Sequence, residues 1–310
     1  MIKVVSSAAL PVTENLMIQK NRIEGAAEPC GKRVCIVTGT HGDELEGQYV
    51  CARLAKLLAD GRQSLSGVVD IYPALNPLGI DSIIRGFPMF NLDMNRIFPG
   101  SASGSLAEST AYDIVKDIEG ADICIDIHSS NIFLREIPQV RVNEQSEEAL
   151  LPYALMLNVD LVWIHAAATV LESTLAYALN ACGVKTLVVE MGVGMRITES
   201  YCEQLLAGIM NLLREIGMWR GAAGKVRSPE VSKDRSVGFV NSDAAGIFIP
   251  RVAHNSVVNA GDVIGSVLDP LTGMTVENAV APCGGLVFTL REYPVVFGGS
   301  LLARIMGALQ

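Results

Sequence analysis

The stretch Val34-Cys35-Ile36-Val37-Thr38-Gly39-Thr40-His41-Gly42-Asp43-Glu44 decides how this chain folds. Its first five residues are mostly apolar or β-branched and do not alternate with polar residues, which is typical of a strand buried on both faces. A turn follows, and the apolar spacing of residues 45–58 then predicts a helix that ends near Asp60-Gly61. His41 and Glu44 are therefore expected in a turn at the carboxyl end of a strand, where open α/β sheets place ligand sites.

The same arrangement occurs twice more along the chain. Residues 123–130 form an apolar run that contains Asp126 and His128, and residues 185–192 form another that leads to Glu190. Helical spacing predicts helices over four ranges: 106–118, 144–157, 171–180 and 201–219. Strands that alternate with helices predict an α/β fold, with a mostly parallel sheet covered by helices on both faces.

Less regular segments complete the chain. Two strands joined through Asn21 and Gly25 are expected near the start, and further strands at 68–73, 140–142 and 159–164. Residues 80–105 read as a long loop, and such loops in compact domains are usually functional or disordered. A linker is expected over 221–234, and short apolar runs between turn residues follow it. We therefore predict a catalytic domain over 1–224 and a small, all-β, sandwich-like or barrel-like domain over 225–310.

Composition excludes several classes of function. The 310 residues carry a net charge of −9, which argues against nucleic acid as a partner, since phosphate binding requires clustered cations. No apolar run approaches the length of about 18 residues that a spanning helix requires, so no membrane partner is expected. The seven cysteines are scattered, and no secretory signal is evident at the N-terminus. Both features favour a cytoplasmic protein with reduced thiols.

In a parallel sheet the three strand exits fall on one edge, so their polar residues can converge. His41, Glu44 and His128 would then form a zinc site with two histidines and one glutamate, leaving a position for water. Asp126 shares a strand face with His128 and could hold its second ring nitrogen. Taken singly, each residue could instead have no catalytic role, as a hydrogen-bonded histidine at a strand end or a solvated carboxylate in a loop. The zinc hypothesis depends on their joint position.

Three further residues suit hydrolytic chemistry beside such a metal. Glu190 is placed to take a proton from water, although it could instead be a carboxylate at a helix N-terminus. Arg85 and Arg96, in the long loop, offer positive charge for a developing oxyanion or for a substrate carboxylate. In a polar loop they could equally be ordinary surface residues.

Four ordered motifs carry a family resemblance: residues 41–44 (HGDE), 93–100 (DMNRIFPG), 126–128 (DIH) and 189–192 (VEMG). They resemble the succinylglutamate desuccinylase/aspartoacylase family, which comprises zinc-dependent amide hydrolases with a zinc-carboxypeptidase-like fold and a β-rich C-terminal domain. The resemblance implies one zinc ion on His41, Glu44 and His128, with Glu190 as base and proton shuttle. It also implies that Arg85 polarises the scissile carbonyl and that Asn95 and Arg96 grip the α-carboxylate of the substrate.

One segment departs from the family pattern. Where aspartoacylase has an arginine for the second substrate carboxylate, this chain has Leu171-Glu172-Ser173-Thr174-Leu175. If Glu172 faces the pocket, it would repel an acidic side chain and favour a basic or neutral substrate, with N-acetyl-diaminobutyrate as one example. The alternative is that Glu172 caps the following helix and points to solvent.

The expected activity is therefore zinc-dependent release of the acyl group from a small-molecule N-acyl amino acid. Two alternatives stay open: a zinc carboxypeptidase that acts on the C-terminus of a peptide, and a non-catalytic binding protein with the same fold. A homo-oligomer is compatible with the sequence. Of the other histidines, His165 is expected in packing or a loop and His254 far from the zinc, while Tyr293 could reach the site from the C-terminal domain.

Overall fold

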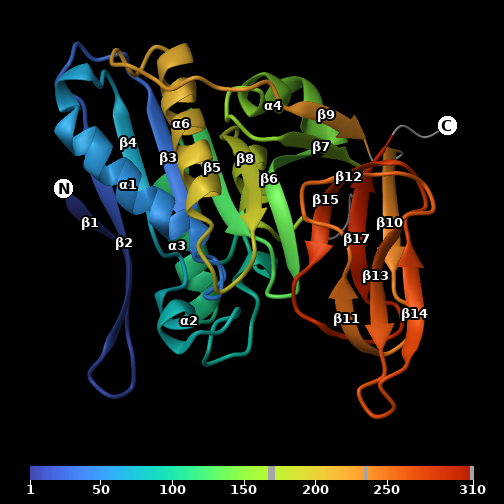
Figure 1. The fold of residues 1–310 in the computed structure, drawn as a ribbon. Helices are drawn as coiled ribbons and strands as arrows, with labels where there is room; N and C mark the ends of the chain where they lie inside the picture. The colour runs from blue at the N-terminus through green and yellow to red at the C-terminus, as the bar shows by residue number, and fades with distance from the viewer. Residues whose placement is uncertain (167–171, 234–235, 308–310) are drawn as a thin grey trace.

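The computed structural model describes residues 1–166, 172–233 and 236–307 (Figure 1). Four strands form the centre of a large sheet in the order β4-β3-β5-β8, and each adjacent pair is parallel. Their bounds are Val68–Tyr72 for β4, Arg33–Thr38 for β3, Ile123–Ser129 for β5 and Lys185–Gly192 for β8. The predicted parallel core is therefore confirmed, and the carboxyl ends of β3, β5 and β8 lie together.

Helices cover both faces of this core. Residues of α1 (Glu46–Asp60) and α6 (Glu199–Glu215) pack in one apolar cluster with alternate residues of the central strands, such as Val34 and Ile36. Residues of α3 (Leu106–Ile118) and α5 (Leu175–Ala181) pack with Cys35 and Val37 on the opposite face. The buried strands are apolar on both sides for this reason. Across the described ranges, the helices are all too short or too polar to cross a membrane.

The sheet extends in both directions from this core. On one side, β2 (Asn15–Glu24) pairs with β4, and β1 (Ile2–Ala9) forms the edge. On the other side, β6 (Leu134–Asn143) runs antiparallel to β8, and it also pairs with the parallel strand β7 (Leu161–His165). Strand β9 (Glu230–Lys233) joins β7 in turn. Short helices α2 (Pro77–Ser82) and α4 (Glu147–Ala154) complete this part.

The C-terminal strands belong partly to the same sheet. Strand β15 (Gly285–Arg291) pairs with β6, and β17 (Leu301–Met306), β10 (Val237–Asn241) and β12 (Val257–Val258) continue from it. A second antiparallel sheet lies beyond, with four strands: β14 (Thr275–Val280), β13 (Val263–Leu268), β11 (Gly246–Pro250) and β16 (Val295–Val296). The C-terminal part is β-rich, as expected. Its boundary near residue 225 stays a prediction, since the large sheet includes strands from both sides of that position.

Several predicted local boundaries are wrong. Asn21 lies inside β2, and the hairpin turns at residues 10–14, where Leu10 donates to the Glu14 carbonyl at 2.8 Å. The helix predicted over 144–157 is a 3₁₀ turn followed by α4, and the predicted linker contains β9. The helix predicted from Leu171, which lies outside the described residues, begins at Leu175. Pairing with β4 and β7, which local sequence does not reveal, overrides the turn signals at Asn21 and in the linker.

Candidate active site

A cavity of about 790 Å³ opens over the carboxyl ends of the central strands. His41 and Glu44 line it from the turn after β3, His128 from the end of β5, and Glu190 from the end of β8. The register of the sheet aligns these ends, because His128 and Glu190 are direct neighbours across β5 and β8. The structure thus brings together the three strand exits that the sequence analysis singled out.

The turn after β3 depends on Gly39, which has a φ of +70°. A Cβ at this position would lie 3.0 Å from the Ala74 Cα, so the backbone conformation and the close approach both favour glycine. This turn bends the chain over the sheet edge and buries His41 and Glu44, which are each 3% exposed. The atoms that could bind a metal, which are the ring nitrogens of His41 and the carboxylate oxygens of Glu44, are therefore directed inward rather than into solvent.

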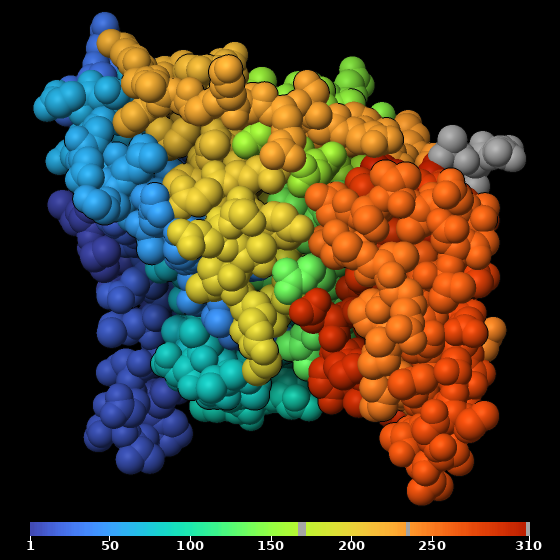
Figure 2. All heavy atoms as spheres, in the orientation of Figure 1, coloured from blue at the N-terminus to red at the C-terminus, as the bar shows by residue number. Residues whose placement is uncertain are grey.

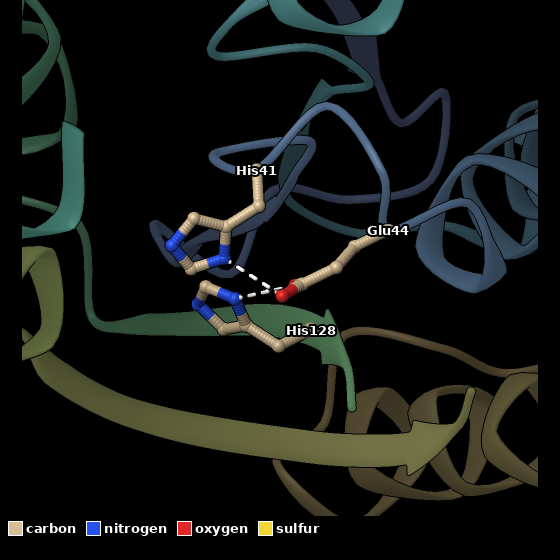
Figure 3. Close-up of side chains that lie close together, drawn as sticks. All are labelled: His41, Glu44 and His128. Atoms are coloured by element: carbon tan, nitrogen blue, oxygen red, sulfur yellow. Dashed lines mark hydrogen bonds and ion pairs between the residues drawn. The ribbon is translucent and has the colours of Figure 1, made fainter. Parts of the chain in front are cut away.

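The side chains of His41, Glu44 and His128 point towards one another (Figure 3). His41 Nδ1 lies 2.8 Å from Glu44 Oε1, and His128 Nδ1 lies 2.9 Å from Glu44 Oε2. One donor atom from each of the three residues lies within 4.8 Å of the others. Two imidazole nitrogens and a carboxylate are a ligand set that catalytic zinc takes, and a compact, buried arrangement of this kind fits such an ion.

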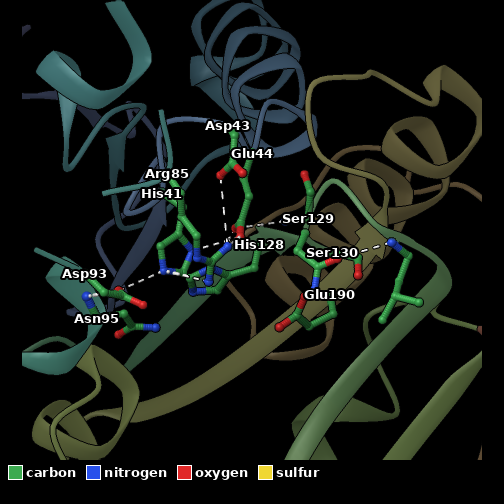
Figure 4. Close-up of polar contacts among 12 residues, drawn as sticks. His41, Asp43, Glu44, Arg85, Asp93, Asn95, His128, Ser129, Ser130 and Glu190 are labelled. Atoms are coloured by element: carbon green, nitrogen blue, oxygen red, sulfur yellow. Dashed lines mark hydrogen bonds and ion pairs between the residues drawn. The ribbon is translucent and has the colours of Figure 1, made fainter. Parts of the chain in front are cut away.

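Each histidine has a carboxylate near its Nε2 atom, and Figure 4 shows the one at His41, which is Asp93. Asp126 Oδ2 lies 3.2 Å from His128 Nε2. Asp93 Oδ1 lies 3.1 Å from His41 Nε2, a contact that the sequence analysis did not predict. The hydrogen bond with Asp93 orients the His41 ring with its Nδ1 towards Glu44, and Asp126 lies at ion-pair distance from His128. Asp93 could have been noticed, because it opens the motif at residues 93–100.

The charges in this group stabilise one another. Burial alone would raise the pKa of Glu44, but the facing imidazoles of His41 and His128 hold it well below its usual range. Burial would likewise lower the pKa of His128, but the carboxylates of Asp126 and Glu44 raise it well above its ordinary value. A buried carboxylate is stable only with such compensation. The carboxylates and imidazoles of this buried group therefore compensate one another's charges.

The long loop supplies cationic and amide side chains next to this group. Arg85 Nη1 lies 2.8 Å from Glu44 Oε1, and Arg85 Nη2 lies 3.1 Å from His41 Nε2. Asn95 and Arg96 line the same cavity. Asn95 Oδ1 accepts a hydrogen bond from the Leu175 backbone N–H at 2.9 Å, so its Nδ2 is left to donate elsewhere.

Glu190 stands beside His128 with its side chain 16% exposed (Figure 4). Burial raises its pKa above the ordinary value, against the opposing positive charges of Arg141 and His128. Arg141 Nη1 lies 3.4 Å from Glu190 Oε1. The sequence analysis missed Arg141, because nothing in the local pattern of residues 140–142 shows that β6 lies next to β8.

The segment before α5 forms another part of the cavity wall. Thr174, not Glu172, caps this helix, because its side chain accepts from the Tyr177 N–H at 3.3 Å. Glu172 is exposed and lines the cavity together with Tyr177 and Asn180. A negative charge therefore lies at the cavity wall where a substrate side chain could reach it.

The other singled-out residues lie outside the group of donor atoms. His165 ends β7, packs against the Trp163 ring and lines the same cavity. His254 and Tyr293 are not among the cavity-lining residues of the described chain. His254 contacts Tyr201 and the Phe288 carbonyl, and Tyr293 packs edge-to-face on Phe133.

The sequence is similar to those of known proteins, both in a family model and in one relative of known name. Residues 30–216 match the family model of the succinylglutamate desuccinylase/aspartoacylase catalytic domain. An N-alpha-acetyl-L-2,4-diaminobutyric acid deacetylase of Halomonas elongata is 28% identical over 290 residues, which cover 88% of this chain and 78% of that protein.

Solved structures share the fold at lower identity. The product-bound ectoine utilization protein EutE (DoeB) from Ruegeria pomeroyi has a TM-score of 0.83 at 22% identity, covering 97% of this chain and 93% of that one. A succinylglutamate desuccinylase/aspartoacylase from Rhodobacter sphaeroides has a TM-score of 0.82 at 21% identity, covering 100% and 96%.

The fold and the cavity define an α/β protein with a metal-type donor group at the exits of parallel strands. The chain belongs to the succinylglutamate desuccinylase/aspartoacylase family. Its relatives are deacylases, which supports an amide hydrolase acting on small N-acyl amino acids.

Proposed function

We propose that this protein is a zinc-dependent amidohydrolase that removes the acyl group from an N-acyl amino acid. The observation that carries the proposal is the convergence of His41, Glu44 and His128 in a cavity beside Glu190. A metal-type donor group and a neighbouring carboxylate are the parts that metal-assisted hydrolysis requires. Family membership supports the same reaction class.

His41, Glu44 and His128 would hold one zinc ion per chain. When bound there, zinc would lower the pKa of a water molecule towards about 7 and polarise the amide carbonyl. Asp126 and Asp93 would keep both imidazoles oriented, since each carboxylate contacts the far ring nitrogen.

Glu190 accepts the proton of the attacking water and returns it to the nitrogen of the leaving amine. Its position beside His128 supports this role, because a general base must lie within reach of the proton that it takes. The raised pKa of its carboxyl is also favourable, since a group that first accepts and then donates a proton works best near the operating pH.

Arg85 and the Asn95–Arg96 pair bind the two polar ends of the substrate. Arg85 lies next to Glu44 and supplies positive charge for the oxygen that becomes negative on the carbonyl. Arg96 and the Nδ2 of Asn95 bind the α-carboxylate, for which the planar guanidinium is suited.

The substrate that we favour has a basic or neutral side chain. Glu172 lines the cavity and does not cap the following helix, so it is available to attract a cation and to repel a carboxylate. The Halomonas relative is named for a substrate with a basic side chain. N-acetyl-diaminobutyrate is therefore the first compound to test.

Two wider predictions accompany this proposal. The chain divides near residue 225 into a catalytic part and a β-rich C-terminal part, and the protein works in the cytoplasm. The buried free thiols of Cys35, Cys51, Cys124 and Cys202 support a reducing location.

The test is a substrate panel with zinc-loaded protein. It contains the N-acetyl derivatives of diaminobutyrate, aspartate and a neutral amino acid, together with peptides that have a free C-terminus. Release of the free amino acid from N-acetyl-diaminobutyrate, lost on chelation and restored by zinc, is the expected result. Turnover of the peptides alone would identify a carboxypeptidase, and no turnover of any compound would contradict the proposal.

A further inference from the structure

A chain of alternating charges connects Glu190 to the C-terminal strand β17. Arg141 Nη1 lies 3.4 Å from Glu190 Oε1, and Arg141 Nη2 donates to Glu136 Oε2 at 2.8 Å. Arg304 Nη1 in turn donates to Glu136 Oε1 at 3.0 Å. Glu136 is 1% exposed, and the three other side chains are at most 27% exposed.

The strand register explains how these residues meet. Gln139 pairs with Glu190 and Arg141 with Val188 across β6 and β8, so Arg141 is one pleat away from Glu190 on the same face. An irregularity between Glu136 and Gln139 shifts the register. Residues three apart would otherwise point to opposite faces, and the shift turns Glu136 to the side of Gln139, whose amide donates to it.

Arg304 reaches Glu136 across one intervening strand. Thr289 of β15 pairs with Glu136 of β6 on one side and with Arg304 of β17 on the other. The three positions lie in a line across the sheet, and the long arginine side chain spans the distance. The C-terminal strand therefore supplies a side chain that lines the active-site cavity.

The network is balanced in charge but not in hydrogen bonds. Two arginines face two glutamates, and the Trp163 ring lies near both guanidinium groups, at 5.6 and 5.4 Å. The Nε atoms of Arg141 and Arg304 are buried and have no hydrogen-bond partner in the part of the chain that the structure describes. A buried N–H group without an acceptor costs free energy, so its presence in a folded protein needs an explanation. Here both guanidinium groups turn their terminal nitrogens to Glu136, and Arg141 also turns one to Glu190.

We propose that Arg304 is a positioning residue, which occupies Glu136 so that Arg141 can hold the Glu190 carboxylate in its working orientation. This inference rests on the proposed function of Glu190. Without Arg304, Glu136 would have Arg141 as its remaining cation and would draw it away from Glu190. A buried carboxylate competes strongly for its remaining cation, because a buried charge without a countercharge is costly even where an amide such as that of Gln139 also donates to it.

The test is steady-state kinetics of zinc-loaded Arg304→Gln on the best substrate of the wild-type protein. The turnover number should fall about ten- to hundredfold, as expected for a misplaced catalytic group, with unchanged KM and zinc content. Arg304→Lys retains a positive charge beside Glu136 and should recover most of kcat. The double variant Glu136→Gln/Arg304→Gln removes the competing carboxylate and should turn over faster than Arg304→Gln alone.

Arg291→Gln is the matched control. Arg291 lies on neighbouring β15 and, among the described residues, donates only to the backbone carbonyls of Tyr293, Val295 and Leu301. Its loss should lower thermal stability without changing kcat. Full activity of Arg304→Gln would overturn the inference. Equal losses of kcat in Arg304→Gln and Arg291→Gln, or a loss of zinc from Arg304→Gln, would overturn it as well. An inactive wild-type protein would overturn the proposed function and the inference together, whereas an active one isolates the inference.

Discussion

Glu190 and His128 are neighbours on adjacent strands, yet we assign them different tasks. His128 is one of three residues whose donor atoms converge, and Glu190 lies outside that group. Glu190→Gln should therefore retain one zinc ion per chain while kcat falls by about 10²–10⁴, the usual contribution of general acid–base catalysis. Elemental analysis and steady-state kinetics on the same preparation measure both quantities.

The control for this prediction is His128→Ala, which removes a donor atom. This variant should lose both metal and activity, because two ligands do not hold zinc firmly. Near-normal turnover in Glu190→Gln would exclude Glu190 as the general base. Full zinc in His128→Ala would show that the metal site is wrongly assigned.

Asn95 and Arg96 define a second residue-level prediction. Both line the cavity, and together they offer a guanidinium and an amide to a carboxylate. A substrate whose α-carboxylate is converted to an amide should lose most of its kcat/KM, since it no longer accepts charge-assisted hydrogen bonds. Competition assays with acid and amide forms of one N-acyl amino acid measure this directly. Equal rates for the two forms would indicate a different anchor.

At the scale of elements, we expect the segment at the start of α5 to determine which substrate side chain the cavity accepts. Glu172 precedes the Thr174 cap and lines the cavity. Glu172→Gln should reduce the preference for N-acetyl-diaminobutyrate over N-acetylaspartate, because it removes the charge that attracts a cationic side chain and repels a carboxylate. The ratio of the two kcat/KM values in wild type and variant is the measurement.

Glu28→Gln is the matched control for the selectivity experiment. It removes the same charge from an exposed position away from the cavity lining, so the ratio should stay at the wild-type value. An unchanged ratio in Glu172→Gln would show that Glu172 is not the selector. A wild-type preference for aspartate would contradict the proposed substrate class.

Elements also explain which parts of the site could be predicted from sequence. His41, Glu44, His128 and Glu190 follow buried parallel strands, whose apolar runs are visible locally and whose ends share one edge. Arg141, Glu136 and Arg304 meet only because β6 is antiparallel, shifted in register and paired through β15 with β17. Such long-range pairing has no local signal. The false turn at Asn21 has the same cause, because its pairing with Ile71 is distant in sequence.

At the scale of the whole molecule, the C-terminal strands are joined in two ways to the part of the chain that the family model matches. Strand β15 continues the large sheet from β6, and Figure 2 shows the orange and red C-terminal segments packed directly against the green and yellow ones. His254, in the loop between β11 and β12, also bridges to α6. Stability and the arrangement of the active site are therefore expected to depend on this junction.

We expect His254 to make the stability of this junction depend on pH. Its Nε2 lies 3.2 Å from the Phe288 carbonyl and its Nδ1 lies 3.3 Å from the Tyr201 hydroxyl, which suits a neutral ring. Burial lowers its pKa below the ordinary value of 6.5, and the nearby positive charge of Arg135 acts in the same direction. Between these two pKa values the unfolded chain binds more protons than the folded one, so folding stability falls as the pH falls.

Thermal unfolding of zinc-loaded protein from pH 7.5 to pH 5.5 tests this linkage. The melting temperature of the wild type should fall as the pH drops through about 6.5, and His254→Gln should show a smaller fall, because glutamine does not titrate. Carboxylates and zinc ligands also respond to acid, but they are common to both proteins, so the difference between the two curves isolates His254. Parallel curves would show that His254 does not couple the junction to pH, and a steeper fall in the variant would mean that the folded state binds the proton more tightly.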